Sequence, residues 1–246
     1  MAVLGAQPQF DAGHRVLPHP ERPRGRARRP RRHLTVALLF IGAGGHGRAL
    51  LELLRDAGLP PPGGVLDDAA DCPGLACPGL PPVPWLGPVA RAAELFSRKD
   101  FDSAHVALGR NALRRQVGES LAAIGYALPV LRHPSAVIAG SARIGPGSAI
   151  LPRAVVGAAV EVGTCAILNT GSIAEHDSVI GPACHLAPGS VLGGGVRLGA
   201  EVLVGILAGV KPGLRIGDGA VIGMGSAVLA DVAPGQEVGG VPARPL

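Results

Sequence analysis

The aliphatic residues of this chain recur at every sixth position from Ile138 to Val228. An α-helix repeats about every 3.6 residues and a strand about every two, so a period of six indicates a short strand followed by a corner, repeated along the chain. The aliphatic positions are Ile138, Ile144, Ile150, Val156, Val162, Leu168, Ala174, Ile180, Leu186, Leu192, Leu198, Val204, Val210, Ile216, Ile222 and Val228.

Two other positions of each six-residue unit follow the same period. The residue after the aliphatic position is often glycine, and the residue four places after it is mostly Ala, Ser or Cys. We expect one aliphatic and one small side chain of each unit to point inward, so that stacked coils bury a continuous column. No aromatic residue follows Tyr126, which suits a thin interior. The general rule for parallel crossovers predicts right-handed connections in such a coil.

A different pattern precedes the repeat. The segment Thr35–Ile41 is a continuous apolar run, as expected of a parallel strand that is buried on both faces. A glycine-rich segment, Gly42–Gly47, and an amphipathic segment, Arg48–Ala57, follow it. A strand, a glycine loop and a helix in this order bind anions, because the backbone can approach a phosphate closely and the helix N-terminus offers free N–H groups.

Asp67 and Asp68 follow a second short strand, Gly64–Leu66, at the place where ribose-binding acids are expected. The pattern permits a dinucleotide site, and it also permits a tight strand–helix turn that binds nothing. The segment up to the repeat, about a hundred residues, is long enough for a half-size βαβ domain but not for two mononucleotide-binding halves. Further predicted elements are helices at 89–97 and 112–124 and strands at 103–108 and 128–131.

The formal net charge of +5 comes from the first 33 residues. That segment holds eight arginines and two acidic residues, a surplus of six, so the rest of the chain carries −1. A nucleic-acid partner is therefore not expected. Residues 1–33 are rich in Pro and Arg, and we expect a disordered basic tail. It is either a passive or mis-assigned extension or an arm that contacts acidic partners, and it lacks the apolar core of a secretory signal.

No apolar run approaches the roughly 20 residues that span a bilayer, so no membrane partner is expected. The cysteines, Cys72, Cys77, Cys165 and Cys184, show no CxxC spacing. We interpret them as reduced thiols of a cytoplasmic protein.

Several motifs along the chain together resemble one family. The motifs are GAGGHG at Gly42–Gly47, the turn Leu66–Asp68, VALGRN at Val106–Asn111, HPSA at His133–Ala136, Asn169–Thr170, Glu175–Asp177 and Gly239–Arg244. In this order they are similar to the sugar O- and N-acetyltransferases of the sialic-acid and bacillosamine type, over about residues 35–244. The resemblance implies an α/β Rossmann-like domain for a nucleotide sugar at 34–134, followed by a left-handed parallel β-helix of hexapeptide repeats at 135–246.

Acetyl transfer from a thioester needs a base, donors for the developing oxyanion, and aligned substrates. Histidine is the natural base near neutral pH, and the repeat contains only His176 and His185. Ala174 is the smallest of the aliphatic positions, and Glu175 takes the usual glycine position. The repeat is therefore interrupted around His176, as is typical of a functional site. The alternative is a solvated corner histidine without a role.

The resemblance also assigns roles to individual residues. It implies that His176 is the general base, that Asp177 raises its basicity and that Asn169 helps to arrange the site. It assigns His185, Ile206 and Met224 to acetyl-coenzyme A, with Gly194 as a candidate oxyanion donor. In the first domain, Gly44, Gly45 and His46 would contact the phosphates of the acceptor, with Asp67 and Asp68 near its base or ribose and Gly87 as a loop contact.

The predicted function is direct transfer from acetyl-coenzyme A to an amino or hydroxyl group of a sugar or nucleotide sugar, in a ternary complex and without a metal. An NAD-binding oxidoreductase and a non-catalytic β-helix scaffold are the alternatives, and neither needs the pattern around His176. A metal-dependent hydratase would need three histidines around one metal, and the repeat contains only two, which argues against this alternative. The resemblance further implies a homotrimer with active sites between neighbouring subunits, which suits a rod with one repeated face.

Overall fold

The computed structural model describes residues 37–246 of the chain. The expectation of a disordered tail at 1–33 lies outside the described residues. Within them, no helix is both long and apolar enough to cross a membrane.

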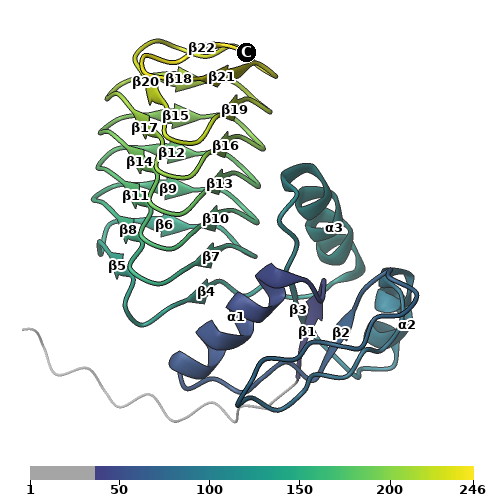
Figure 1. The fold of residues 1–246 in the computed structure, drawn as a ribbon. Coiled ribbons are helices and arrows are strands. Elements are labelled where there is room, and N and C mark those ends of the chain that lie inside the picture. The colour runs from purple at the N-terminus through teal and green to yellow at the C-terminus, as the bar shows by residue number, and fades with distance from the viewer. Residues whose placement is uncertain (1–36) are drawn as a thin grey trace, which may run out of the picture. The chain divides into compact units, whose positions relative to one another are not determined.

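The first domain is built on a three-stranded parallel sheet of order β2-β1-β3 (Figure 1). The strands are β1, Leu38–Ile41, β2, Gly64–Leu66, and β3, Ser103–Val106. The strands predicted at 35–41, 64–66 and 103–108 correspond to β1, β2 and β3, with residues 35 and 36 outside the described part of the chain. Leu39, Phe40 and Ile41 of β1 are fully buried, which explains why no polar residue interrupts this run.

Three helical segments accompany this sheet. The first is α1, Gly45–Asp56. The second is a 3₁₀ turn, Val89–Arg91, that continues into α2, Ala92–Ser97, and the third is α3, Asn111–Ile124. Helix α1 begins inside the glycine-rich segment rather than at Arg48, so His46 lies in its first turn. Gly125 caps the C-terminus of α3 with a φ of 113°, a value that glycine adopts without strain but that strains other residues.

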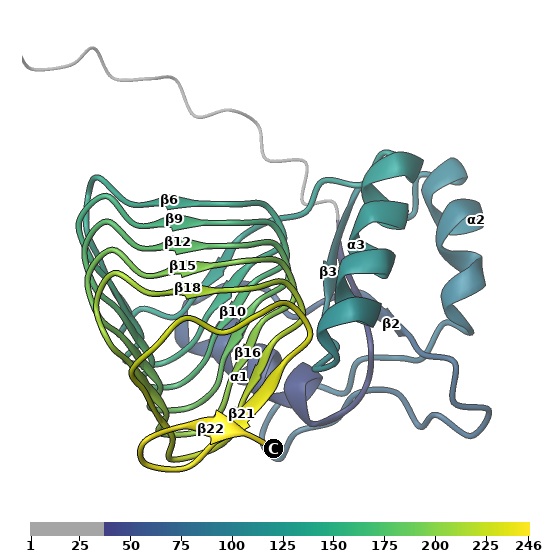
Figure 2. The ribbon, with the colours of Figure 1, turned by 90° about the horizontal axis from the view of Figure 1, so that it is seen from above.

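The repeat forms a left-handed parallel β-helix, as the resemblance implied (Figures 1 and 2). Its strands form three faces, which we name by chain order. The first face contains β4, Leu131–Arg132, β7, Ala149–Ile150, β10, Ile167–Leu168, β13, His185–Leu186, β16, Leu203–Val204, β19, Val221–Ile222, β21, Glu237–Gly239, and β22, Arg244–Pro245. The second contains β5, Val137–Ile138, β8, Val155–Val156, β11, Ile173–Ala174, β14, Val191–Leu192, β17, Gly209–Val210, and β20, Ala227–Val228. The third contains β6, Arg143–Ile144, β9, Glu161–Val162, β12, Val179–Ile180, β15, Arg197–Leu198, and β18, Arg215–Ile216.

One prediction about this region was wrong, and one general rule does not hold for it. The rule for right-handed connections describes twisted strands joined through a helix, whereas here two-residue strands are joined by corners and further short strands. The strand predicted at 128–131 does not join the first domain's sheet as a regular strand. Ala127 makes one isolated bridge to Ser103, and β4 instead pairs with β7 in the β-helix.

The aliphatic position of each unit points into the β-helix, as predicted. From Ile150 to Val228 all these side chains are buried, together with small residues four places later such as Ala154, Ser172 and Cys184. The residue three places after the aliphatic position has a positive φ at nearly every corner. These corner residues are Gly147, Arg153, Ala159, Cys165, Gly171, Asp177, Ala183, Gly189, Gly195, Glu201, Leu207, Gly213, Gly219 and Gly225.

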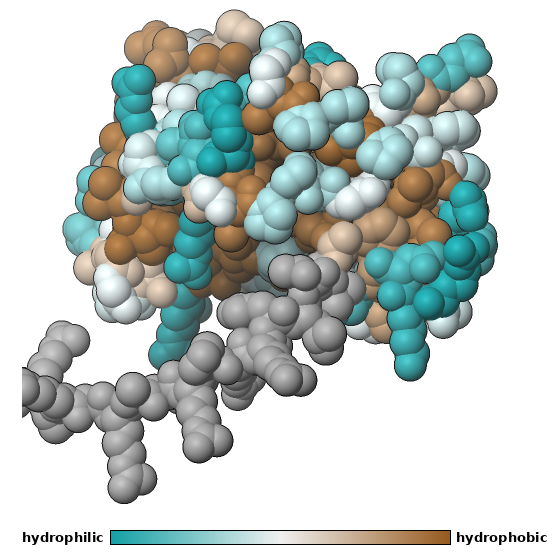
Figure 3. Space-filling view, turned by 90° about the horizontal axis from the view of Figure 1, so that it is seen from below, coloured by the Kyte–Doolittle hydropathy of each residue, from teal (hydrophilic) through white to brown (hydrophobic). Residues whose placement is uncertain are grey.

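The outer sides of the three faces differ in polarity. Outward residues of the first face, such as Ala149 and Ile167, share a core cluster with Phe40 and Leu50 of the first domain. The second face carries only small or aliphatic outward residues, namely Val137, Val155, Ile173, Val191, Gly209 and Ala227. The third carries Arg143, Glu161, Val179, Arg197 and Arg215. Seen from below, apolar patches lie over the β-helix half of the molecule (Figure 3).

Candidate active site

His176 lies at the corner between β11 and β12, where the second face turns into the third. Its Nδ1 is 2.7 Å from Oδ2 of Asp177, and the side chains are 63% and 68% exposed. The hydrogen bond that Asp177 accepts, together with its negative charge, raises the pKa of His176. An Nδ1–H that donates to this carboxylate leaves Nε2 as the proton acceptor. The two residues therefore form an imidazole–carboxylate pair that is exposed on the outside of the coil.

Gly194 lies beside His176 on the next coil of the same edge. A Cβ added at Gly194 would come within 2.7 Å of both Cε1 and Nε2 of the imidazole. The N–H of Gly195 donates to the carbonyl of His176, whereas the N–H of Gly194 has no backbone acceptor among residues 37–246. The structure thus places one free backbone donor close to the accepting nitrogen of the imidazole.

Asn169 and His185 form a second group on the first face. The carbonyl oxygen of the Asn169 side chain accepts the N–H of Thr170, at 2.8 Å, which turns its amide nitrogen towards Nε2 of His185, at 3.1 Å. His185 is mostly buried, and burial together with the charge of Arg114 lowers its pKa to about 4. The imidazole is therefore neutral near pH 7, with Nε2 accepting a hydrogen bond from Asn169.

His46 lies close enough to this second group for its charges to affect the pKa of His46. Burial, followed by the charges of His105, Arg114 and His185, lowers its pKa to about 3. Its Nε2 atom is buried and has no hydrogen-bond partner in the described part of the chain. The first turn of α1 thus brings one histidine from the glycine loop towards the histidine of the first face.

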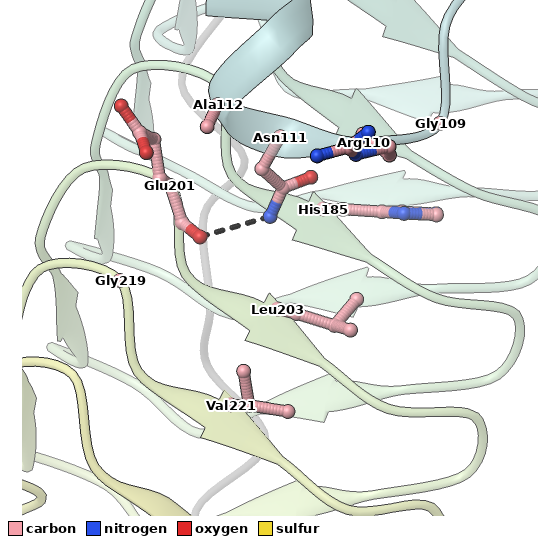
Figure 4. Close-up of a pocket in the computed structure, with 9 residues that line it drawn as sticks. All are labelled: Gly109, Arg110, Asn111, Ala112, His185, Glu201, Leu203, Gly219 and Val221. Atoms are coloured by element: carbon pink, nitrogen blue, oxygen red, sulfur yellow. Dashed lines mark hydrogen bonds between the residues drawn. The ribbon is translucent and has the colours of Figure 1, made fainter.

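His185 also lines a cavity of about 470 Å³. Figure 4 shows the residues around it, with the side-chain amide of Asn111 hydrogen-bonded to the carbonyl of Glu201. The cavity is lined by Gly109, Arg110, Asn111, Ala112, His185, Glu201, Leu203, Gly219 and Val221. Sequence reasoning did not assign Arg110 or Asn111 to the site. The signal was present, because both belong to the VALGRN motif that follows β3.

Of the predicted acceptor-binding residues, Gly44 and Asp67 line a cavity at the start of α1, whereas Gly45, His46, Asp68 and Gly87 are not among its lining residues. This cavity of about 480 Å³ is lined by Ala43, Gly44, Arg48, Asp67, Ala69, Asp71, Cys72, Pro73, Gly74 and Ala76. Gly44 is the N-cap, no side chain caps the helix, and its first turn carries no acidic residue. These conditions favour an anion at this helix end. Arg48 and Asp71, which line the cavity, were not anticipated.

The structure gives Asp67 a bracing position. Its two carboxylate oxygens accept the N–H groups of Ala43 and Ala69, at 2.8 and 2.9 Å, so it holds the glycine loop to the end of β2. Asp68 accepts the N–H of Val89 through Oδ1, and the carbonyl of Gly87 accepts the N–H of Asp67. Much of the hydrogen-bonding capacity of this acidic pair is therefore used within the chain.

Ile206 and Met224 lie on the edge between the first and second faces, which also carries Asn169. Their side chains are 45% and 75% exposed, and the carbonyl of Ile206 accepts the N–H of Gly225. His176 lies on a different edge, between the second and third faces. Within one chain the predicted residues thus fall into separate groups, one around His176 and the others around the first face and the glycine loop.

The chain is similar to a family model and to several solved structures. The model of the PglD N-terminal domain matches residues 37–121. PerB from Caulobacter crescentus, solved with CoA and GDP-perosamine, is 34% identical with a TM-score of 0.78, covering 85% of this chain and 97% of its own. The acetyltransferase domain of PglB from Neisseria gonorrhoeae FA1090 is 35% identical with a TM-score of 0.77, covering 85% and 98%. WeeI from Acinetobacter baumannii AYE is 25% identical with a TM-score of 0.72, covering 85% and 99%.

The fold and the comparisons together define a hexapeptide-repeat acyltransferase. Within that class, the chain belongs to the family of sugar N-acetyltransferases that includes PerB and the acetyltransferase domain of PglB. It is therefore an acetyltransferase, as the motifs predicted.

Proposed function

We propose that this chain transfers the acetyl group of acetyl-coenzyme A to the amino group of a nucleotide-activated sugar, with His176 as the general base. PerB was solved with CoA and GDP-perosamine, and the PglB domain with acetyl coenzyme A. Those complexes support both the donor and the acceptor class. The observation that carries the base assignment is the exposed pair of His176 and Asp177 beside the free N–H of Gly194.

In the proposed reaction, His176 acts first as a base and then as an acid. Nε2 of His176 takes a proton from the acceptor amine while the nitrogen attacks the thioester carbonyl. The negative charge that develops on the carbonyl oxygen is stabilised by an N–H donor, for which Gly194 is the candidate. When the carbon–sulfur bond breaks, the protonated imidazole returns the proton to the departing thiolate. Asp177 favours the imidazolium between these two proton transfers.

The glycine loop is proposed to hold the diphosphate of the acceptor. Gly44, Gly45 and His46 begin α1, whose uncapped N-terminus favours an anion, and Arg48 adds a positive charge to the same cavity. On the first face, Asn169 and the neutral His185 offer hydrogen bonds near the acetyl donor, and Ile206 and Met224 supply apolar contacts along the neighbouring edge.

We further propose that the site is completed by a second copy of the chain, in a homotrimer. His176 and the group around His185 lie on different edges of the β-helix, so a single chain does not bring all the proposed site residues together. The second face between those edges is aliphatic and uncovered among the described residues, with Val137 63% exposed and Val191 38% exposed. A face of this kind favours burial against a copy, and cyclic closure suits three rods.

The test is an acetyl-transfer assay on a panel of nucleotide-linked amino sugars, their hydroxyl counterparts and the free amino sugars, read by thiol release. We expect turnover with at least one nucleotide-linked amino sugar and at least about tenfold less with its hydroxyl counterpart. Equal rates on the hydroxyl series would move the proposal to O-acetylation, and the absence of any transfer would refute it.

A further inference from the structure

Arg114 is a fully buried guanidinium without a carboxylate partner in the described part of the chain. It lies in the first turns of α3 and is 1% exposed. Nε donates to the carbonyl of Cys165 at 2.7 Å, and one terminal nitrogen donates to the carbonyls of Leu108 and Gly109 at 3.1 and 3.0 Å. The other donates to Oδ1 of Asn111 at 2.8 Å and to the carbonyl of Ala183 at 2.7 Å. The five donors of the guanidinium therefore have an acceptor each.

The acceptors on the β-helix are equivalent corner residues of successive coils. Cys165 and Ala183 are 18 residues apart on the edge between the third and first faces, and Glu201 follows at the same interval. The side-chain amide of Asn111 extends the series, since it donates to the carbonyl of Glu201 at 2.9 Å. All three corner residues have φ between 53° and 60°, a conformation that costs about 1–2 kcal/mol outside glycine.

Helix α3 contacts these corners along a single stripe. Gly118 faces Cys165, because a Cβ there would lie 2.5 Å from the cysteine sulfur, and Asn111 and Arg114 precede it on the same side of the helix. An α-helix rises about 5.4 Å per turn, and neighbouring coils lie about 4.8 Å apart. One helix turn therefore matches one coil, and the stripe meets three consecutive coils. Figure 2 shows α3 beside this edge of the β-helix.

Apolar packing alone does not define which coils the first domain occupies. The outward residues of the first face are Ala149, Ile167, His185, Leu203 and Val221, a largely aliphatic series that repeats at each coil. A shift by one coil would still place aliphatic side chains against the domain. A buried guanidinium rarely adds stability over an apolar side chain of similar size, but it can specify a single arrangement. Equivalent corner carbonyls recur at every coil, so the guanidinium does not select one coil, but a displacement by a fraction of a coil would leave its buried donors without acceptors. A displacement by a whole coil is opposed by the connection to the β-helix, where Ala127 accepts the N–H of Ala104 and the next residue, Leu128, accepts the N–H of Gly147.

We propose that Arg114 and Asn111 are positioning residues, which fix the first domain at one register along the β-helix so that the acceptor reaches the acetyl donor. This inference rests on the proposed function. The glycine loop, which is proposed to hold the acceptor, moves with the first domain, whereas Asn169 and His185 belong to the coils. A slip by a fraction of the coil spacing of about 4.8 Å displaces the two against each other, and misplacement by even about 1 Å can lower a rate a hundredfold.

The test compares Arg114→Met with Arg115→Met. Arg115 is the next residue of α3, and it is partly exposed in ion pairs with Glu119 and Glu201. We expect Arg114→Met to bind acetyl-CoA, UDP and GDP with dissociation constants within about threefold of the parent, and its kcat to fall at least about tenfold. Arg115→Met should keep kcat within about threefold. If kcat of Arg114→Met also stays within threefold at a temperature where it is folded, the proposal is overturned.

A disulfide can hold α3 in place without Arg114, and this separates a positioning role of Arg114 from a general effect on stability. The ideal Cβ at Gly118 lies 3.8 Å from the Cβ of Cys165, which matches disulfide geometry. In Arg114→Met/Gly118→Cys, oxidation should restore kcat to within about threefold of oxidised Gly118→Cys, because the crosslink fixes the helix on its coil. Failure of the confirmed disulfide to restore kcat would refute the positioning role. If Arg114→Met does not fold, Arg114→Lys, which keeps the charge but not the planar fork, takes its place.

The same variants give a readout that does not depend on acetyl transfer. If the parent acetylates no acceptor, the proposed function fails, but the register is still reported by the rate at which the disulfide forms. We expect that rate to be at least about tenfold lower in Arg114→Met/Gly118→Cys than in Gly118→Cys alone. Equal rates would show that Arg114 does not set the register.

Discussion

The imidazole of His176 lies against Gly194, at a place where a single added methyl group would come within 2.7 Å of Nε2. Both residues occupy the same corner position on successive coils, 18 residues apart on one edge. The close approach limits the directions open to the imidazole and brings the backbone of Gly194 near Nε2.

Substitution Gly194→Ala should therefore impair turnover more than folding. The backbone of Gly194 does not require a positive φ, so alanine is tolerated there, but its methyl group displaces the imidazole. We expect kcat to fall about 10–100-fold, with little change in the thermal midpoint. Gly140→Ala is the matched control, since Gly140 has the same corner position on the same edge and an added Cβ meets nothing within 4 Å. Similar kcat values for the two variants would contradict the arrangement.

His176→Ala should lower kcat by roughly 10²–10⁴ while leaving the affinity for acetyl-CoA nearly unchanged, because the base acts in the transition state. Asp177→Asn should lower kcat less, because the imidazole of His176 remains. Asparagine also accepts the φ of 60° at this corner, so the backbone should be unchanged. The trimer and the thermal midpoint serve as controls for folding. A His176→Ala variant that turns over within a few-fold of the parent would exclude this histidine as the base.

The pH profile of Asp177→Asn provides an independent check on the pair. Asp177 raises the pKa of His176, and only the neutral imidazole can accept a proton, so the acidic limb of the parent profile should lie above pH 6.5. Removal of the negative charge should move that limb to lower pH. An unchanged limb in kcat/KM would show that a different group controls the rate.

The buried histidines predict that the fold loses stability in mild acid. Burial lowers the pKa of His46 to about 3 and those of His105 and His185 to about 4, below the unfolded value of 6.5. The unfolded chain binds these protons first, so stability is full above pH 6.5 and falls as the pH drops towards 4. Each histidine contributes a slope of up to about 1.4 kcal/mol per pH unit.

Urea unfolding between pH 7 and pH 4.5 measures that slope. His105→Gln removes one titrating group that lies outside the proposed machinery, and it should flatten the slope by about one proton relative to the parent. Carboxylates affect both proteins alike and cancel in the difference. Identical slopes would mean that His105 does not stay neutral in the folded protein.

The aliphatic second face predicts the effect of charge on assembly. Val191→Glu places a carboxylate on this face, and it should convert the proposed trimer to monomers in sedimentation and lower activity by at least about a hundredfold. Val179→Glu, on the charged third face between Glu161 and Arg197, should leave both unchanged. A stable monomeric parent would contradict the trimer directly.

A shared site also predicts complementation between inactive variants. Trimers reassembled from an equal mixture of His176→Ala and His185→Ala chains should regain about a quarter of the parent activity, because some sites then combine two intact residues. No regain after confirmed subunit exchange would place both histidines in one chain's site.

The sequence predicted the β-helix well because its period is set by burial. The aliphatic position of each unit points into a narrow column whose remaining inward positions hold small residues such as Ser172, and so the pattern had no exceptions. That Asn169 and His176, in consecutive units, lie on different edges of the coil was not predicted.

Other features depend on contacts that no local pattern reports. Arginine inside an amphipathic helix is usually solvated, so nothing in residues 111–124 marked Arg114 as buried; its acceptors lie 51 and 69 residues further along the chain. Asp67 matched a ribose-binding position, but its bonds to Ala43 and Ala69 appear only when the glycine loop is folded against β2. The early start of α1 at Gly45 was missed because no capping side chain precedes it.

The stripe of α3 along the corners has a consequence for how this protein can change length. Equivalent corners recur at every coil, so an additional coil between Cys165 and Ala183 would keep their spacing, but it would move His185 one coil away from the first domain. Among the described residues, the hydrogen bonds that α3 makes to the coils end at Val202, so an 18-residue coil inserted beyond Met224 leaves them in place. Natural variation in the number of coils should therefore accumulate at the C-terminal end, while the coils beside α3 keep a constant count.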